Sequence, residues 1–243
     1  MNRIYLSIVV PCYNEEGNIL TLVKAFEPLA THYRDFGFEL VLVDNGSEDG
    51  TRKKIKQTIE THDFVKLAVV DKNQGYGFGI LSGLAACQGE YLGWLHADLQ
   101  VMPEEIHTGM EQIQTQTEAS RCFVKGRRKN RPFSDCLFTF GMSCFETLYM
   151  KQRLYDINAQ PTLFHREFYK SWKNPPYDFS LDLYAFYLAR VHKMQVLRFP
   201  VKQREREYGN SSWNTGMGAR IKLIKRVLSY SAMLKRQICK MED

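Results

Sequence analysis

The sequence predicts an α/β protein built on an open, mostly parallel β-sheet with helices on both faces. Short apolar runs alternate four times with stretches of helical spacing in the first half of the chain. The apolar runs are continuous, which is typical of parallel strands that are buried on both faces. A chain of 243 residues with 44% hydrophobic and 25% charged residues also has the composition of a folded globular protein.

The first predicted strand and helix follow the N-terminus directly. Tyr5 to Val10 is an apolar, β-branched run before Pro11, so we expect a buried strand there. The segment from Asn14 to about Tyr33 has helical spacing of its apolar residues, which are Ile19, Leu22, Val23, Phe26 and Leu29. This order of strand, polar loop and helix is the first repeat of the predicted sheet.

Three more strand–helix pairs follow the same pattern. The predicted strands are Phe38 to Val43, Val65 to Val70 and Tyr91 to Leu95. The predicted helices are Thr51 to Thr61, Gly77 to Cys87 and a helix opened by Pro103, a residue that fits a first helical turn.

The pattern weakens after Lys125. We expect a basic loop from Gly126 to Pro132 and a mixed aromatic helix from about Phe133 to Met150. No low-complexity linker or internal repeat marks a boundary, so residues 1–216 are predicted to form one domain, followed by a helix over 217–243.

The ends of the predicted strands carry the polar residues of interest. Open α/β sheets bind ligands at the carboxyl ends of their strands. Each of the four strand-end segments contains a carboxylate; the segments are Pro11-Cys12-Tyr13-Asn14-Glu15, Asp44-Asn45-Gly46-Ser47, Asp71-Lys72-Asn73-Gln74-Gly75 and His96-Ala97-Asp98. We therefore expect the functional site at this edge.

Three glycines follow the third strand, at Gly75, Gly77 and Gly79. The dinucleotide-binding pattern G-x-G-x-x-G fails here, because it requires glycine at Ile80 or at Ser82. The glycines either let the backbone approach a phosphate or pack the helix against the sheet. A nicotinamide-dependent dehydrogenase is disfavoured.

Two strand ends offer groups for a ligand. Asp44 is either part of a polar turn or projects into the crevice, where it could bind a base or a ribose. In an extended segment, His96, Asp98 and Gln100 lie on one side and present imidazole, carboxylate and amide to one point. Such a set can hold a divalent metal that bridges phosphates.

Cysteine spacing, the absence of long apolar runs and the net charge exclude further classes of protein. The six cysteines form no C-x-x-C pair, which indicates reduced thiols in a reducing compartment. The N-terminal apolar run is too short for a signal peptide, and no window approaches the roughly 18 apolar residues of a transmembrane helix, so we expect a cytoplasmic protein. The net charge of +6 suits an anionic ligand and does not require nucleic acid.

Four motifs resemble family 2 inverting glycosyltransferases of the GT-A (Rossmann-like) fold, in particular dolichol-phosphate mannose synthase and the bacterial polyprenyl-phosphate glycosyltransferases. The motifs are Val9-Val10-Pro11-Cys12-Tyr13-Asn14-Glu15, Val43-Asp44-Asn45-Gly46-Ser47-Glu48-Asp49-Gly50-Thr51, Asn73-Gln74-Gly75 and Ala97-Asp98-Leu99-Gln100. Their order and spacing cover about the first 105 residues, and weaker matches continue to about Trp213.

The resemblance implies a nucleotide-diphosphate sugar as donor. Its nucleoside is expected to contact Pro11, Tyr13, Glu15, Asp44, Asn73, Gly75 and Ala97. The family's Asp-x-Asp-x-Gln metal motif falls on His96, Asp98 and Gln100, so histidine replaces the first carboxylate. The site then either takes a softer ion, Mn²⁺ rather than Mg²⁺, or relies on arginines and the remaining aspartate.

The resemblance also implies residues for the acceptor. Arg127, Arg128, Arg206 and Ser211 match positions that hold phosphate oxygens. Asp182 matches an acidic position near the acceptor, and the catalytic set implied is Asp98, Asp182 and Arg206.

Three interpretations of the activity stay open. The first is transfer of one sugar to a lipid-linked acceptor, most simply a polyprenyl phosphate, which is already anionic and needs little help from a base. The second is transfer to a hydroxyl of a glycan, for which a carboxylate such as Asp182 would accept the proton. The third is a catalytically degenerate module that only binds a nucleotide-sugar.

The C-terminal segment from Met217 to Lys240 has the pattern of a basic amphipathic helix. It either docks on the domain with a solvated basic face or contacts anionic lipid headgroups at the cytoplasmic face of a membrane. The oligomeric state has no signature in the sequence.

Overall fold

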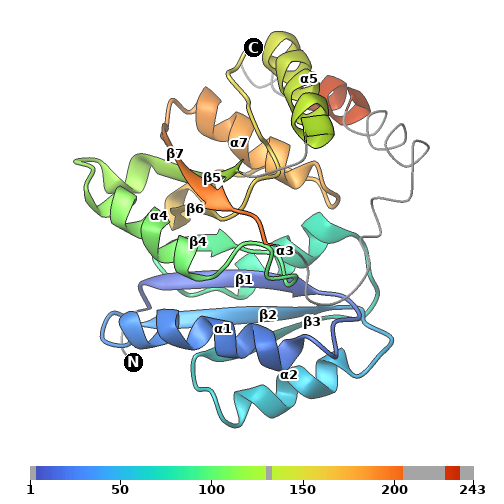
Figure 1. The fold of residues 1–243 in the computed structure, drawn as a ribbon, viewed down its shortest axis with the longest axis vertical. Coiled ribbons are helices and arrows are strands. Elements are labelled where there is room, and N and C mark those ends of the chain that lie inside the picture. Colours follow the sequence, from blue (N-terminus) through green and yellow to red (C-terminus); the bar gives the residue numbers. More distant parts are fainter. Residues whose placement is uncertain (1–3, 130–132, 205–227, 236–243) are drawn as a thin grey trace.

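A computed structural model describes residues 4–129, 133–204 and 228–235 of the chain (Figure 1). Its core is one seven-stranded sheet of order β3-β2-β1-β4-β6-β5-β7. The strands are β1 (Leu6–Cys12), β2 (Phe38–Asn45), β3 (Val65–Val70), β4 (Tyr91–Trp94), β5 (Cys122–Lys129), β6 (Thr162–His165) and β7 (Gln195–Lys202). The prediction of an open, mostly parallel α/β sheet is confirmed.

The parallel half of the sheet brings the polar strand ends together. Strand β1 pairs in parallel with β2 on one side, from Leu6 opposite Phe38 to Cys12 opposite Asp44. On its other side β1 pairs in parallel with β4, and β2 pairs with β3. The loops after β1, β2, β3 and β4 therefore leave the sheet at one edge. This is the edge at which the sequence predicts the site.

Strand β6 interrupts the parallel order, because it runs antiparallel to both β4 and β5. It inserts residues from far along the chain beside β4, with Thr162 opposite both Trp94 and Lys125. The pairing of β5 with β7 is parallel again. Side chains of β4, β5 and β6 therefore meet next to the predicted site.

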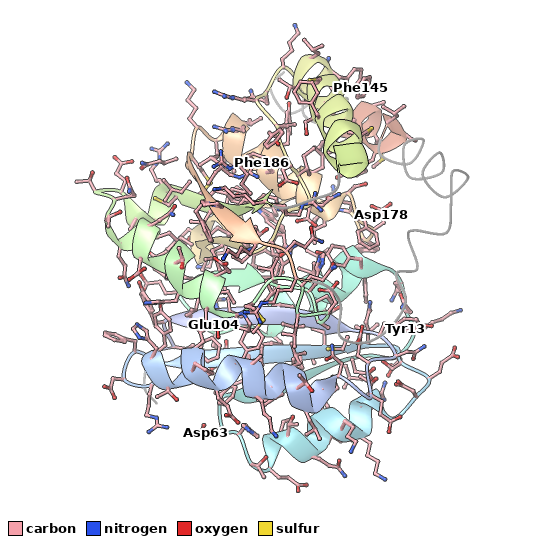
Figure 2. All side chains as sticks on the ribbon, in the orientation of Figure 1. Tyr13, Asp63, Glu104, Phe145, Asp178 and Phe186 are labelled. Atoms are coloured by element: carbon pink, nitrogen blue, oxygen red, sulfur yellow. The ribbon has the colours of Figure 1, made fainter. Side chains whose placement is uncertain are left out.

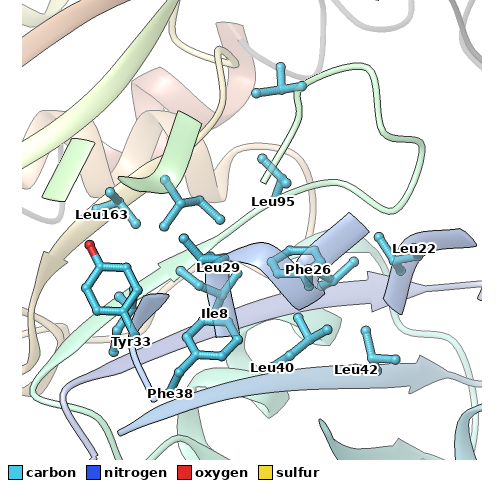
Figure 3. Packing of buried hydrophobic residues seen from close by; sticks show 14 of the residues in the cluster. Ile8, Leu22, Phe26, Leu29, Tyr33, Phe38, Leu40, Leu42, Leu95 and Leu163 are labelled. Carbon is cyan, nitrogen blue, oxygen red and sulfur yellow. The ribbon is translucent and has the colours of Figure 1, made fainter. Parts of the chain in front are cut away.

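Helices cover both faces of the sheet (Figure 1). They are α1 (Ile19–His32), α2 (Thr51–Ile59), α3 (Tyr76–Ala86), α4 (Glu104–Gln114), α5 (Phe133–Met150), α6 (Arg166–Lys170) and α7 (Leu181–Val191), with a 3₁₀ turn η1 (Ala119–Arg121) before β5. Apolar residues of α1, α2 and α4 pack with one sheet face, where Phe26 and Leu29 meet Ile8 and Leu40 (Figure 3). Residues of α3 and α7 pack with the other face.

Two predicted elements differ from the structure. The first helix begins at Ile19 rather than Asn14, because residues 14–16 bond instead to the loop after β2. The predicted basic loop after Lys125 begins as strand: β5 continues to Lys129 through pairing with β7, which a local pattern does not reveal.

The predicted C-terminal helix lies mostly outside the described residues. Its described part, residues 228–235, is helical and packs on α5, where Ser231 Oγ lies 2.8 Å from both carboxylate oxygens of Glu146. The division of the chain at residue 216 stays a prediction. Among the described helices, none combines the length and apolar character that a membrane span requires.

Candidate functional site

The loops after β1 and β2 are joined to one another by hydrogen bonds. The backbone N–H of Glu15 donates to Thr51 Oγ1 (2.8 Å), and the N–H of Glu48 donates to Asn14 Oδ1 (2.9 Å). Asn18 Nδ2 donates to the carbonyl of Ala97, which connects this pair of loops to the end of β4. Three of the predicted motifs therefore form one continuous edge.

Tyr13 is an exposed aromatic residue of this edge, with 44% of its surface accessible. Its position is labelled in Figure 2. An exposed aromatic ring at a strand end can stack on a nucleobase. Pro11 lies in β1 beyond the last residue that pairs with β4. The predicted contacts of Pro11, Tyr13, Glu15 and Ala97 with a nucleoside are compatible with this placement and stay predictions.

Asp44 is buried at the end of β2, and its expected contact with a base or a ribose stays a prediction. Its side chain is fully buried and accepts hydrogen bonds from the backbone N–H of Ser47 (3.0 Å) and from Arg52 Nε (2.5 Å). A strand-end aspartate that accepts from the third residue after it forms a turn of the kind expected for such residues. Asp44 therefore shapes the loop after β2.

The glycines of α3 are in close contact with protein backbone. A Cβ atom at Gly75 would lie 2.6 Å from the carbonyl oxygen of Tyr177, and one at Gly77 would lie 2.6 Å from the carbonyl oxygens of Pro176 and Asp178. Gly75 also has a φ of +115°, a value that favours glycine. The structure thus favours packing for these glycines: Gly75 and Gly77 contact the loop before α7, and a Cβ atom at Gly79 would lie 2.9 Å from the side chain of Asn45 in β2.

Asn73 supports the same turn, because its Oδ1 accepts from the backbone N–H of Gly75 at 2.8 Å. Its side chain is otherwise exposed. Contact of Asn73 and Gly75 with a donor nucleotide stays a prediction.

The side chains of the three predicted metal ligands do not point to one common position, as they would in an extended segment. Residues 97 and 98 are in a turn, and Leu99 has a left-handed φ of 51°, so side chains no longer alternate between two sides. His96 Nε2 lies 2.9 Å from Tyr76 Oη, and Asp98 Oδ1 accepts from the backbone N–H of Gln100. The amide of Gln100 contacts residues 203 and 204.

This donor set does not fit a preassembled metal centre. Within the described ranges, no three His, Cys, Asp or Glu side chains are grouped so that they could hold an ion. Of the predicted ligands, Asp98 alone carries a charge that a hard cation prefers, since burial lowers the pKa of His96 and favours the neutral imidazole. We therefore assign no step of the chemistry to a bound metal.

A buried ion pair next to His96 was not predicted. Lys125 Nζ lies 2.8 Å from Asp182 Oδ1 and 2.9 Å from Thr162 Oγ1, and the side chains of Lys125 and Asp182 are 0% and 1% exposed. Tyr76 Oη donates to Asp182 Oδ2 at 3.2 Å. Asp182 is thus connected to His96 through Tyr76 in a site closed to water, and its expected place near the acceptor stays a prediction.

In the sequence, Lys125 directly precedes the predicted basic loop. A signal was present, because a lysine directly after the apolar residues Cys122, Phe123 and Val124 is placed in a buried strand, where lysine is almost never found without a partner. Tyr76 and Gln160, which also contact His96, carried no comparable signal.

The basic residues of β5 are placed differently from one another. Arg127 is exposed, in agreement with a role in phosphate binding. Arg128 is paired with Asp156 through Nε (2.8 Å) and Nη2 (2.5 Å), and its backbone N–H donates to the same carboxylate. This bidentate pairing lowers the pKa of Asp156 and occupies the Arg128 fork that was expected to hold phosphate. Arg206 and Ser211 lie outside the described residues.

Comparison with known proteins gives a consistent result. Residues 7–181 match the model of the family described as Glycosyl transferase family 2. An undecaprenyl-phosphate 4-deoxy-4-formamido-L-arabinose transferase from Pseudomonas syringae pv. syringae (strain B728a) is 39% identical over 103 residues, which are 42% of this chain and 30% of that protein. The protein of the same name from Proteus mirabilis (strain HI4320) is 32% identical over 131 residues, 52% of this chain and 37% of its own. The chain thus spans about a third of the length of these curated relatives.

Solved structures share the fold at low sequence identity. Glucosyl-3-phosphoglycerate synthase from Mycobacterium tuberculosis, in complex with UDP, superimposes with a TM-score of 0.69 at 16% identity, covering 96% of this chain and 80% of that one. The mannosyltransferase PcManGT from Pyrobaculum calidifontis, in complex with GDP-Man and Mn²⁺, has a TM-score of 0.61 at 18% identity, with coverages of 85% and 59%. At these identities the likeness concerns the fold alone.

Proposed function

The chain belongs to glycosyl transferase family 2, and we propose that it transfers a single sugar from a nucleotide-diphosphate donor to the phosphate of a polyprenyl lipid. The donor is proposed to bind at the edge formed by the loops after β1, β2 and β4, where Tyr13 is exposed and Asp98 lies in the turn after β4. Membrane-embedded acceptors of this kind require the catalytic edge to work next to a bilayer.

The observation that carries the choice of acceptor is the state of Asp182. A hydroxyl acceptor must lose a proton, and a general base must lie within hydrogen-bond reach of that proton. Asp182, the base implied by the resemblance, is buried, paired with Lys125 and bonded to Tyr76. An acceptor that is already ionised, such as a phosphate monoester, needs no such base.

The proposed reaction is a single displacement. An oxygen of the acceptor phosphate attacks the anomeric carbon, the bond from that carbon to the donor diphosphate breaks, and the nucleoside diphosphate leaves with the electron pair. No proton changes hands, and in-line attack inverts the anomeric configuration. The protein's contribution is to hold the two partners in line and to offset their like charges, for which exposed Arg127 is available.

The names of the curated relatives support the lipid phosphate, since they are undecaprenyl-phosphate sugar transferases. An apolar surface on α5 supports it independently. Phe140, Phe145 and Leu148 are exposed there at 58%, 39% and 79%, and exposed Lys151 and Arg153 follow the end of that helix. Figure 2 labels Phe145 on α5. Apolar side chains next to basic ones suit the boundary of an anionic membrane.

The proposal is tested by offering matched acceptors with the same tail. Full-length protein is incubated with UDP-, GDP- and dTDP-sugars and either undecaprenyl phosphate or undecaprenol, and products are identified by mass spectrometry. We expect a sugar phosphate lipid from the first acceptor and no product from the second. Equal transfer to the alcohol, or to a soluble glycan, would contradict the argument from Asp182.

A degenerate module that only binds a nucleotide-sugar is the second candidate. It is favoured by one observation, the replacement of the first carboxylate of the metal motif by His96. Calorimetric binding of a nucleotide-sugar without turnover on any of these acceptors, in the presence of either Mn²⁺ or Mg²⁺, would support it.

A further inference from the structure

Arginine side chains gather where α7, β7 and the segment after α5 meet. Arg190, in the last turn of α7, donates from Nε to the backbone carbonyl of Arg153 at 3.2 Å. Arg198 of β7 donates from Nη1 to the carbonyl of Tyr155 (2.6 Å) and from Nε and Nη2 to the carbonyl of Gly126 in β5 (3.1 and 2.7 Å). Two arginines therefore hold the segment after α5 against the rest of the domain.

The same two guanidinium groups lie over one aromatic ring. The Cζ atoms of Arg190 and Arg198 are 5.5 and 5.4 Å from the ring centroid of Phe186. Phe186 is 1% exposed, and Figure 2 labels it on α7. A cation over a ring face is attracted by the ring, which helps to hold the arginine side chain in place. A guanidinium group that is already held loses less conformational freedom when it binds a ligand.

Carboxylates do not balance the positive charge of this region. Arg128 already occupies the carboxylate of Asp156. The other arginines here form no ion pair with any residue that the structure describes; they are Arg127, Arg153, Arg190 and Arg198. The region therefore has an excess of positive charge.

Repulsion between these charges affects the pKa values of two arginines. Burial lowers the pKa of Arg190, and the charge of Arg153 lowers it further. Burial lowers the pKa of Arg198 to about 10; Asp156 opposes this shift, and the charges of Arg190 and Arg127 add to it. Both arginines stay cationic at neutral pH, so the fold holds like charges close together. A bound anion would offset this repulsion.

Two of these arginines keep hydrogen-bond donors for a ligand. Arg190 is half-buried, and its Nη1 and Nη2 groups bond to no described residue. Arg153 is exposed, and its side chain likewise bonds to none of the described residues. The planar N–H pairs of arginine match the oxygens of a phosphate group, and two neighbouring guanidinium groups can donate to several phosphate oxygens at once.

We propose that Arg153 and Arg190 form an anion site that binds a phosphate group, carried either by a lipid headgroup or by a small phosphorylated molecule. Arg190 is held by Phe186 and by the Arg153 carbonyl, so its free N–H groups have a fixed direction. Arg198 and Arg127 add positive charge nearby.

This anion site lies apart from the proposed donor edge. Helix α7 carries Asp182 in its first turn and Arg190 in its last turn. Asp182 is the residue that is connected to His96 through Tyr76. At 1.5 Å per residue, Arg190 lies about 12 Å further along the helix axis. The anion site therefore does not depend on the proposed function.

The site is tested by NMR on full-length protein labelled with ¹⁵N-arginine. The Nε–H of Arg190 is hydrogen-bonded to a carbonyl, which slows its exchange with water and makes its signal observable. Arg190→Lys identifies this signal. Inorganic phosphate is titrated at constant ionic strength, with chloride as the replacing anion, because general screening then stays the same. We expect a saturable shift of the Arg190 signal in the wild type.

Arg153→Gln removes one of the two proposed phosphate ligands. Its backbone carbonyl can still accept from Arg190, and the replaced side chain is exposed, so the fold should be retained. We expect the Kd for phosphate to rise at least about tenfold, the effect of losing a charge-assisted hydrogen bond. The matched control is Arg34→Gln, which removes the same charge from an exposed residue after α1 and should leave Kd within about twofold of wild type.

Two soluble lipids distinguish the sources of the phosphate group. Dihexanoyl-phosphatidylglycerol and dihexanoyl-phosphatidylcholine are titrated below their critical micelle concentrations. Tighter binding of phosphatidylglycerol than of inorganic phosphate, with weaker binding of the choline lipid, assigns the site to anionic lipid headgroups. Tighter binding of inorganic phosphate assigns it to a small phosphorylated molecule.

The proposal is overturned if the Arg190 signal shows no saturable shift with inorganic phosphate or phosphatidylglycerol. It is also overturned if Arg153→Gln binds both probes as tightly as the wild type does. The measurement needs no sugar transfer. A wild type that transfers to no acceptor but binds phosphate at Arg190 therefore contradicts only the proposed function.

Discussion

Replacing Lys125 by methionine is expected to lower the free energy of unfolding by more than the loss of one hydrogen bond to Asp182 would. Both side chains of the pair are closed to solvent, so water does not screen the charge that remains. Removing one partner of such a pair costs about 3 to 5 kcal/mol. For a chain of this size, where 1 kcal/mol shifts Tm by about 2 to 4 °C, the expected fall in Tm is about 6 to 20 °C.

Removing both charges should be less harmful than removing one. The double variant Lys125→Met/Asp182→Leu leaves no buried charge, and apolar replacement of a buried pair is often neutral. We expect the double variant to lie within about 2 kcal/mol of wild type in urea unfolding followed by circular dichroism, with an unchanged m-value.

The exposed pair Lys170–Glu167 is a matched control for this cycle. Its Lys170→Met variant should leave Tm nearly unchanged, because water screens an exposed pair. The reasoning is refuted if Lys125→Met is as mild as Lys170→Met, or if the double variant is less stable than the single one.

Further predictions concern pH, the donor edge and the membrane. Burial raises the pKa of Glu146 to about 7, so its contribution to stability is complete below about pH 4.5 and is lost as pH rises through 7. Glu146→Gln should therefore increase the free energy of unfolding at pH 8 by at most about 3 kcal/mol, seen as a higher Tm, and should leave Tm at pH 5 nearly unchanged. Equal gains in Tm at both pH values would contradict this. Asp98→Ala is expected to abolish transfer with an unchanged Tm, and turnover within a few-fold of wild type would refute its assignment to the site. His96→Asp adds a carboxylate to the predicted metal motif and should strengthen Mg²⁺-dependent nucleotide binding in calorimetry; an unchanged metal preference argues against any role in binding an ion. Phe145→Ser on α5 should weaken flotation with anionic vesicles, whereas Phe36→Ser, an exposed apolar residue on another part of the molecule, should not.

The sequence identified the features that depend on local patterns. Apolar runs and helical spacing can be recognised within about ten residues. The strands and helices of the first half were therefore predicted within a few residues of their observed bounds. Parallel pairing then brings the strand ends to one edge, so the position of Asp98 at that edge followed as well. The motif order also identified the family, which the family match confirms.

Other features depended on contacts between segments that are distant along the chain. Strand β6 enters the sheet beside β4 in the antiparallel direction, and no local pattern encodes that partner. Backbone carbonyls of residues 176–178 surround Gly75 and Gly77, about a hundred residues earlier in the chain, and exclude side chains there. The sequence alone left these glycines divided between phosphate binding and packing.

The pairing of Lys125 with Asp182 shows most clearly that the site depends on contacts between distant segments. From the sequence, Lys125 belonged to a basic segment and Asp182 was a potential base, because each residue was interpreted from its own neighbours. The fold places them 2.8 Å apart, although 57 residues separate them, and removes both from water. Local sequence determines which charges are present, whereas burial and pairing, which only the tertiary structure decides, determine whether a charge can take a proton, bind a phosphate or hold its neighbour in position.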